Sequence, residues 1–208
     1  KIIKYFFEFL IVISLFIIFK IIGLKYASNI GSLIGKIFGP FFRPKKIVRK
    51  NIKIGLGDLK KEKENEIING MWSNIGRTFA EYVFLKDFKL NKTKSNHMKI
   101  NGIHHLDQIK KSKEPVIFYS GHFANFELMA MEIDKFGINC AAIYRPLNNY
   151  FLNPLMENIR KKYICSKQIK KGISGTKEIL KHFKSGTSIA LMIDQRVSQG
   201  IKSALFKN

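Results

Sequence analysis

The longest apolar stretch of the chain lies close to its first residue. Ile, Leu, Phe and Val fill most positions from 5 to 24, and no charged residue occurs between Phe9 and Phe19. A helix of about twenty apolar residues is long enough to span a hydrocarbon core, and Lys20 falls where a lysine can reach the headgroups. We predict that residues 1–28 form a membrane anchor that spans the bilayer or lies in its interface. A cleaved signal peptide and a buried helix of a soluble protein are the alternatives.

A second periodic segment covers residues 60–86. Apolar side chains recur there at steps of three and four residues and form one stripe: Ile67, Ile68, Met71, Trp72, Ile75, Phe79 and Val83. This spacing predicts an amphipathic helix that packs its stripe, including Trp72, into the core.

Farther along the chain, short apolar runs alternate with helical patterns. The runs with the composition of buried strands are 115–119, 140–144 and 188–193. The helical patterns are 125–136, 153–163 and 174–184. This alternation predicts an α/β domain with a largely parallel central sheet flanked by helices. We assign residues 29–208 to this domain and expect it to be incomplete at its C-terminus.

Polar residues follow each of the three predicted strands. These clusters are Gly121-His122, Arg145-Pro146 and Asp194-Gln195-Arg196. Ligands of open parallel sheets bind outside the carboxyl ends of the strands. The three clusters are therefore expected to meet in one site.

The first cluster opens a segment in which His122 and Glu127 are separated by four residues. On one continuous helix the two side chains would point about 140° apart. With His122 in the turn after the strand and Glu127 in the first helical turn, N-capped by Asn125, they could meet. A carboxylate on one imidazole nitrogen leaves the other free to remove a proton from a hydroxyl, and helix N–H groups can stabilise an oxyanion. On its own this spacing favours local structural roles for both residues.

The chain is strongly basic, with 37 Lys and Arg against 15 Asp and Glu and a net charge of +22. One interpretation is a polyanionic partner; the other is the lysine enrichment of an AT-rich genome, since 31 of the 37 are Lys. A run without any acidic residue consists of Arg43, Lys45, Lys46, Arg49, Lys50 and Lys53. Such a run marks the cytoplasmic side of a membrane helix and attracts anionic headgroups. It lacks the signatures of a nucleic-acid-binding segment.

The remaining residues with reactive side chains predict little chemistry. Cys140 and Cys165 lack CxxC spacing, so we expect two buried or idle thiols in a reducing compartment rather than a disulfide or a zinc site. Surface positions are expected for the other histidines, which are His97, His104, His105 and His182. The sequence has no glycine-rich nucleotide loop and no metal-ligand spacing, so neither a metal nor a cofactor is expected.

Several of these segments occur together in a known family. The strings are GHFANFELMA from Gly121, IYRPLNN with Asn153-Pro154, RKNIKIGL around Asn51, and LMIDQ ending at Gln195, together with Arg160, Gly186 and the apolar N-terminal helix. In this order they make the chain similar, over nearly its whole length, to the lipid A biosynthesis acyltransferases. These are the late lauroyl and myristoyl transferases within the lysophospholipid-acyltransferase-like group. That family continues beyond the last string, which is why we expect an incomplete domain.

The resemblance implies a role for each matching residue. His122 would be the general base on the acceptor hydroxyl, and Glu127 its orienting partner. Arg145 would bind a phosphate or polarise the thioester carbonyl. The expected substrate-binding residues are Arg145, Asn125, Arg160, Asp194 and Gln195.

The arginines agree with this assignment. Three of the six, Arg145, Arg160 and Arg196, lie in or beside the family strings. A guanidinium group binds phosphate in a bidentate geometry that lysine cannot copy. A charge on a helix surface is the alternative interpretation of Arg160.

The expected activity is transfer of a fatty acyl chain from acyl-acyl-carrier-protein to a hydroxyl of a lipid A precursor, at the cytoplasmic face of the bacterial inner membrane. The expected partners are acyl carrier protein, a phosphorylated glycolipid and an anionic membrane, with no nucleic acid. Another lipid acyltransferase, acting on a lysophospholipid, glycerol phosphate or an acylated amino acid, is the first alternative. A non-enzymatic basic membrane-binding module is the second.

Overall fold

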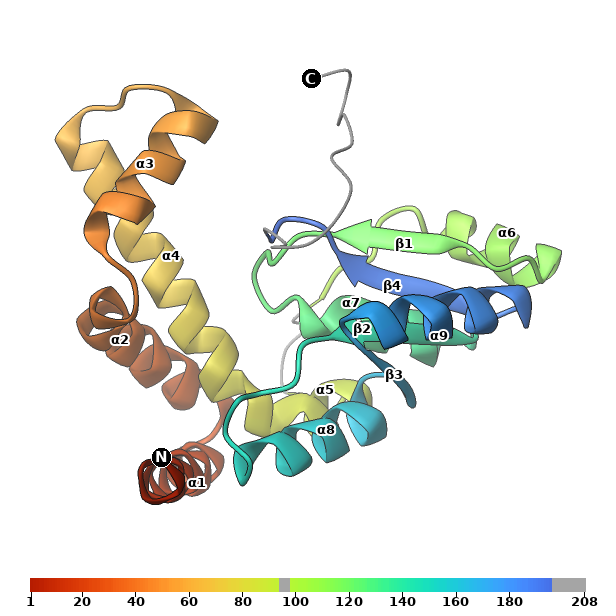
Figure 1. The fold of residues 1–208 in the computed structure, drawn as a ribbon, viewed down its shortest axis with the longest axis horizontal. Coiled ribbons are helices and arrows are strands. Elements are labelled where there is room, and N and C mark those ends of the chain that lie inside the picture. The colour runs from red at the N-terminus through yellow and green to blue at the C-terminus, as the bar shows by residue number, and fades with distance from the viewer. Residues whose placement is uncertain (94–97, 196–208) are drawn as a thin grey trace.

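The computed structural model describes residues 1–93 and 98–195 and contains a four-stranded parallel sheet (Figure 1). The strands are β1 (Ile117–Ser120), β2 (Cys140–Tyr144), β3 (Lys167–Lys170) and β4 (Ser188–Met192), in the order β1-β4-β2-β3. The predicted α/β fold with a parallel sheet is confirmed. His97, Arg196 and the segment in which the sequence predicts an incomplete domain lie outside the described residues.

Helices cover both faces of the sheet. They are α6 (Ile103–Ser112), α7 (Glu127–Lys135), α8 (Leu152–Tyr163) and α9 (Ile173–Lys184). Successive residues of a strand point to opposite faces. Ala141 and Ile189 accordingly pack towards Ile179 of α9, whereas Cys140 belongs to the larger core cluster, which includes Met131 of α7. In Figure 1, α9 lies in front of the sheet and α7 lies behind it.

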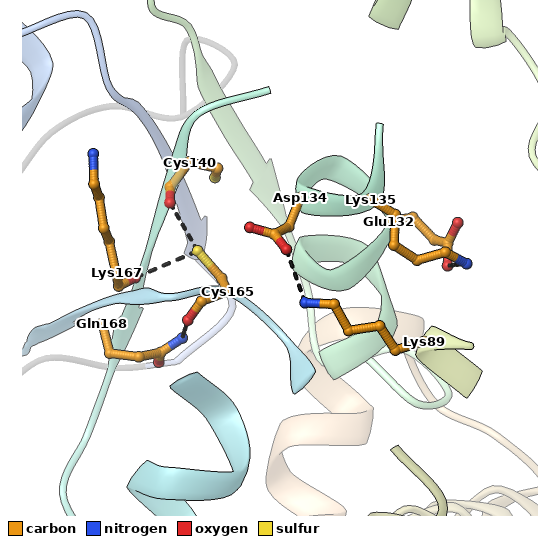
Figure 2. Close-up of polar contacts among 8 residues, drawn as sticks. All are labelled: Lys89, Glu132, Asp134, Lys135, Cys140, Cys165, Lys167 and Gln168. Carbon is orange, nitrogen blue, oxygen red and sulfur yellow. Dashed lines mark hydrogen bonds and ion pairs between the residues drawn. The ribbon is translucent and has the colours of Figure 1, made fainter. Parts of the chain in front are cut away.

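Two buried thiols lie side by side where β2 and β3 enter the core (Figure 2). Cys165 Sγ donates a hydrogen bond to the carbonyl oxygen of Cys140 at 2.7 Å. The contact with the Cys165 thiol and burial both raise the pKa of the Cys140 thiol far above its ordinary value, so Cys140 stays protonated. The predicted burial of both cysteines is confirmed. Nearby, an ion pair of 2.9 Å between Lys89 and Asp134 joins α5 (Leu85–Lys89) to α7.

The N-terminal region is helical. It comprises α1 (Ile2–Ile22), α2 (Leu24–Phe42), α3 (Lys45–Leu56) and α4 (Lys61–Glu81), followed by the 3₁₀ turn η1 (Tyr82–Phe84). In the part of the chain that the structure describes, α1 is the one helix long and apolar enough to cross a membrane. The helix predicted over 60–86 is confirmed as α4, η1 and α5, and Trp72 is buried as predicted.

Glycines bring α2 and α4 into close contact. A Cβ atom on Gly76 of α4 would lie 1.9 Å from the carbonyl oxygen of Gly31, and one on Gly35 would lie 2.1 Å from the carbonyl oxygen of Trp72. Neither position has room for a side chain. Helix α4 thus packs closely on α2, and side chains of its second half contact the turn that carries His122.

Candidate active site

The polar residues that follow β1, β2 and β4 meet in one cleft, as the sequence predicts. The cleft has a volume of about 660 Å³, and its lining includes His122, Arg145 and Gln195. Glu127 and Arg160 also line it, whereas Asp194 reaches it through a contact with His122. Apolar side chains such as Leu191 and Met192 supply part of the wall. The cleft can therefore accept a molecule with both apolar and charged parts.

The turn that carries His122 is shaped by its neighbours. A Cβ atom on Gly121 would lie 2.8 Å from the ring of Phe123 and 3.1 Å from Asp194 Oδ2, so glycine lets the carboxylate approach the backbone. Ala124 has a φ of 44°, a conformation that costs free energy for a residue with a side chain. Its carbonyl oxygen accepts hydrogen bonds from Asn74 Nδ2 (3.2 Å) and Thr78 Oγ1 (3.1 Å). Helix α4 thus holds this turn in place.

The imidazole of His122 is paired with the carboxylate of Asp194. His122 Nδ1 lies 2.7 Å from Asp194 Oδ1, and the backbone N–H of His122 donates to Oδ2 at 2.7 Å. Partial burial opposes ionisation of Asp194, but these hydrogen bonds from His122 prevail and lower the pKa of the carboxyl group. Asp194 is therefore an acceptor, which places the proton of the neutral imidazole on Nδ1.

The second nitrogen of the ring faces the cleft. His122 Nε2 lies 3.3 Å from Gln195 Nε2. With the proton on Nδ1, Nε2 is the ring's acceptor, and the Gln195 amide donates to it. The ring of Phe126 packs edge-on against the imidazole, with centroids 4.4 Å apart. An imidazole oriented in this way is suited to take a proton from a hydroxyl that replaces the Gln195 amide at Nε2.

Glu127 has a different environment from the one predicted. Its side chain is buried, and Oε1 accepts hydrogen bonds from Tyr82 Oη (2.5 Å), Arg160 Nε (3.0 Å) and Arg160 Nη2 (2.6 Å). A buried carboxylate requires compensation of its charge, and Arg160 of α8 supplies it. Burial, followed by the charge of Glu127, raises the pKa of Tyr82 well above its ordinary value, so its hydroxyl remains a donor.

The predicted contact between Glu127 and His122 is therefore wrong, because Asp194 is the carboxylate that orients the imidazole. Helix α7 begins at Glu127, and this start directs the side chain towards η1 and α8. Asn125 is not the N-cap of α7; its Nδ2 donates instead to Glu81 Oε2 at 3.0 Å. The interpretation of Arg160 as a surface charge is also wrong, since only 17% of its side chain is exposed.

Cationic side chains border the cleft. Arg145 is exposed after β2, and Lys170 and Lys171 follow at the end of β3. Sequence reasoning missed both lysines and Tyr82. β3 gives no strand signal because its four residues, Lys-Gln-Ile-Lys, contain one apolar side chain. Tyr82 belongs to no recognisable sequence motif. It donates a hydrogen bond to Glu127, and this contact exists only because Glu127 is buried.

The fold and the cleft define a class of protein. A parallel α/β sheet that carries a carboxylate-held imidazole beside a partly apolar, cationic cleft is suited to general-base chemistry on an amphipathic, anionic substrate. The chain matches the bacterial lipid A biosynthesis acyltransferases over residues 1–207 and belongs to that family. It is therefore an acyltransferase enzyme of lipid A biosynthesis. No curated protein sequence gives a significant match.

Proposed function

We propose that this acyltransferase moves a fatty acyl chain from the thioester of acyl carrier protein to a hydroxyl of a lipid A precursor, with His122 as the general base. The observation that carries the proposal is the 2.7 Å contact between His122 Nδ1 and Asp194 Oδ1, which leaves Nε2 as an acceptor at the cleft. The family supports the reaction class and the lipid acceptor. The donor and the residue roles belong to the proposal.

The chemical step proceeds through addition and elimination. His122 Nε2 takes the proton of the acceptor hydroxyl as its oxygen attacks the thioester carbonyl, and Asp194 stabilises the resulting imidazolium. The tetrahedral intermediate then collapses, the carbon–sulfur bond breaks, and the departing thiolate takes the proton from Nε2. The products are an ester and a free thiol, and the imidazole returns to its neutral state.

The other residues of the cleft bind and position the substrates. We assign phosphate binding to Arg145, with Lys170 and Lys171 on the same rim, and contact with the reacting groups to Gln195. Glu127 and Tyr82 hold the Arg160 guanidinium against the cleft. Asn125 ties the His122 turn to α4. In this scheme Glu127 acts through Arg160 rather than through His122.

The proposal includes the location of the reaction. Residues 1–28 would serve as the membrane anchor and residues 29–208 as the acyltransferase domain, at the cytoplasmic face of the inner membrane. The net charge of +22 suits a phosphorylated glycolipid, an acidic carrier protein and an anionic bilayer.

The mechanism is tested with membranes that contain the full-length enzyme, acyl carrier protein thioesters and a labelled lipid A precursor. His122→Ala is expected to abolish transfer, since general-base catalysis contributes about 10²–10⁴-fold. His182→Ala is the matched control, because His182 lies on α9 and pairs with Glu178 outside the cleft lining. Near-wild-type transfer by His122→Ala would falsify the mechanism.

The acceptor is tested separately. Mass spectrometry of lipids from a strain that lacks the enzyme should show the loss of one secondary acyl chain of lipid A. Intact lipid A together with a change in phospholipids or acylated amino acids would instead select another acceptor. Salt-sensitive vesicle binding without any transfer would identify a membrane-binding module.

A further inference from the structure

We infer that α1 does not cross the bilayer but lies lengthwise in the interface of one leaflet, and that α2 continues the same membrane-embedded surface. Both helices expose apolar faces, and basic residues follow them in the chain. The occupant of these faces is one leaflet of an anionic bilayer.

The first observation is that α1 contacts the rest of the protein along nearly its whole length. Towards its start, Asn149 Nδ2 donates to the carbonyl oxygen of Tyr5 at 2.8 Å and to Glu8 Oε2 at 3.1 Å. Near its end, Lys20 Nζ lies 2.5 Å from Asp87 Oδ2. Positions 5 and 20 of a helix are about 22 Å apart, at 1.5 Å per residue. The helix is thus a docked element of the domain and not a free tether.

Aromatic packing connects these two ends. The rings of Phe16 and Phe79 have centroids 5.2 Å apart, and those of Phe6 and Phe151 are 5.7 Å apart. Phe16 and Phe19 are buried against the protein. A continuous seam therefore joins α1 to the 149–151 loop, to α4 and to the segment after α4.

The opposite face of α1 has no partner among the described residues. The exposed side chains recur at steps of three, four or seven residues and share one face: Ile3, Phe7, Ile11, Ile18 and Ile21, each at least 50% exposed. Exposed apolar surface of this extent marks an interaction site. Because the docked side of α1 is covered by the domain, only this outer face is available to lipid.

An upright α1 would bring the domain into the hydrocarbon. The core of a bilayer is about 30 Å thick, so the seam of about 22 Å would occupy most of that depth. The charged groups at the ends of the seam, which are Glu8, Asp87 and the exposed Lys86, would then lie inside the edges of the hydrocarbon core, where charges are costly. An α1 lying in the interface leaves all of these groups on the aqueous side.

Helix α2 extends the apolar surface. Its glycines pack on α4, while its other face exposes Tyr26, Ile30, Leu33, Ile37 and Phe41. In Figure 1, α1 and α2 lie together at the end of the molecule away from α6. Lys45, Lys46 and Lys50, which are exposed at the start of α3, follow directly. An apolar helix face followed in the chain by exposed lysines matches an anionic leaflet, in which headgroup charges surround an apolar layer.

The arrangement has a consequence for the cleft. The loop that leaves β2 with Arg145 is the loop whose Asn149 contacts α1. Tyr150 and Phe151, both exposed, lie on the same loop and pack against Tyr5 and Phe6 of α1. Tyrosine and phenylalanine side chains in such positions insert at the membrane interface. The cationic rim of the cleft is thereby held close to the headgroup layer.

The test measures the depth of α1 in the bilayer. The full-length protein is reconstituted in phosphatidylethanolamine–phosphatidylglycerol vesicles whose acyl chains carry bromine at a shallow or a deep position. Tryptophan is introduced singly as Ile3→Trp, Ile11→Trp or Ile21→Trp, and the native Trp72 is buried and common to all three. Similar quenching at the three positions, strongest with shallow bromine, is expected. Deep-bromine quenching that peaks at Ile11 would overturn the inference, because an upright helix places Ile11 about 12 Å deeper than Ile3.

Sidedness gives an independent readout. Lys4→Cys and Lys25→Cys flank the apolar core of α1 at exposed positions, and the native thiols are buried. In oriented membrane vesicles, an impermeant maleimide should label both sites from the same side, with detergent-solubilised protein as the control for reactivity. Labelling of the two sites from opposite sides would show that α1 spans the bilayer.

Discussion

The carboxylate of Asp194 contacts His122 twice, at the ring Nδ1 and at the backbone N–H, each at 2.7 Å. The two residues come from the ends of β1 and β4, which are adjacent parallel strands in the sheet. The double contact fixes both the position of the histidine in the turn and the orientation of its ring. The fold itself therefore sets the tautomer that a general base requires.

Asp194→Asn is expected to lower acyl transfer by about 10²-fold or more, because the imidazole loses the anion that stabilises its protonated form. The stability of the protein should change little, since the Asp194 side chain is 41% exposed. Turnover and thermal unfolding of the same preparation separate the two effects. A variant that loses stability and activity in parallel would indicate that Asp194 is merely structural.

Glu127→Ala, unlike Asp194→Asn, is expected to cause a large loss of stability. The change leaves Arg160 without its buried partner, and breaking such a pair costs about 3–5 kcal/mol of unfolding free energy. Denaturant titration of the variant in detergent micelles measures this loss. The double variant Glu127→Ala with Arg160→Met should recover part of the loss, because no unpaired charge remains buried. Full stability of the single variant would contradict the buried ion pair.

The contact between α2 and α4 gives a matched pair of glycine substitutions. Gly76→Ala would place a Cβ atom 1.9 Å from the Gly31 carbonyl oxygen, and overpacking of this kind costs about 1–3 kcal/mol. Gly70→Ala lies on the same helix with open space around it, and it should stabilise the helix by about 0.5–1 kcal/mol. The midpoint of thermal unfolding should thus fall for the first variant and rise for the second. Equal shifts would argue against the close helix contact.

Much of the sheet could be predicted from the sequence because three strands are short apolar runs. Strand β3 could not be predicted, because Ile169 is its one fully buried residue and the other three are polar or charged. Residues 100–103 form no strand, although Ile100 and Ile103 favour one locally: Gly102, with a φ of 73°, precedes α6, which begins at Ile103. The packing of α6 decides the outcome.

The location of the site could be predicted from the sequence, but the carboxylate that pairs with His122 could not. Parallel strand ends meet at one edge of a sheet, so the clusters around His122, Arg145 and Asp194 had to converge. The partner of the imidazole was not apparent from spacing, because Asp194 lies 72 residues from His122 whereas Glu127 lies nearby in sequence. The buried position of Glu127 depends on Arg160 of α8, and local sequence cannot show such a tertiary contact.

The basic start of α3 should contribute to membrane binding in a salt-dependent way. Replacing Lys45, Lys46 and Lys50 with glutamine removes three exposed charges from α3, the helix that follows α2 in the chain. At about 1 kcal/mol for each residue, the affinity for phosphatidylglycerol-containing vesicles should fall by about a hundredfold at low salt. The difference should shrink at high salt as the charges are screened.

The control for this prediction removes the same number of charges elsewhere. Lys177, Lys181 and Lys184 are exposed on α9, which lies on the sheet domain away from α1 and α2 (Figure 1). Their replacement with glutamine should leave vesicle affinity close to that of the unmodified protein, because they do not face the leaflet contacted by α2. Equal losses in the two triple variants would mean that net charge alone drives the association. A loss confined to the α3 variant would identify the surface that faces the membrane.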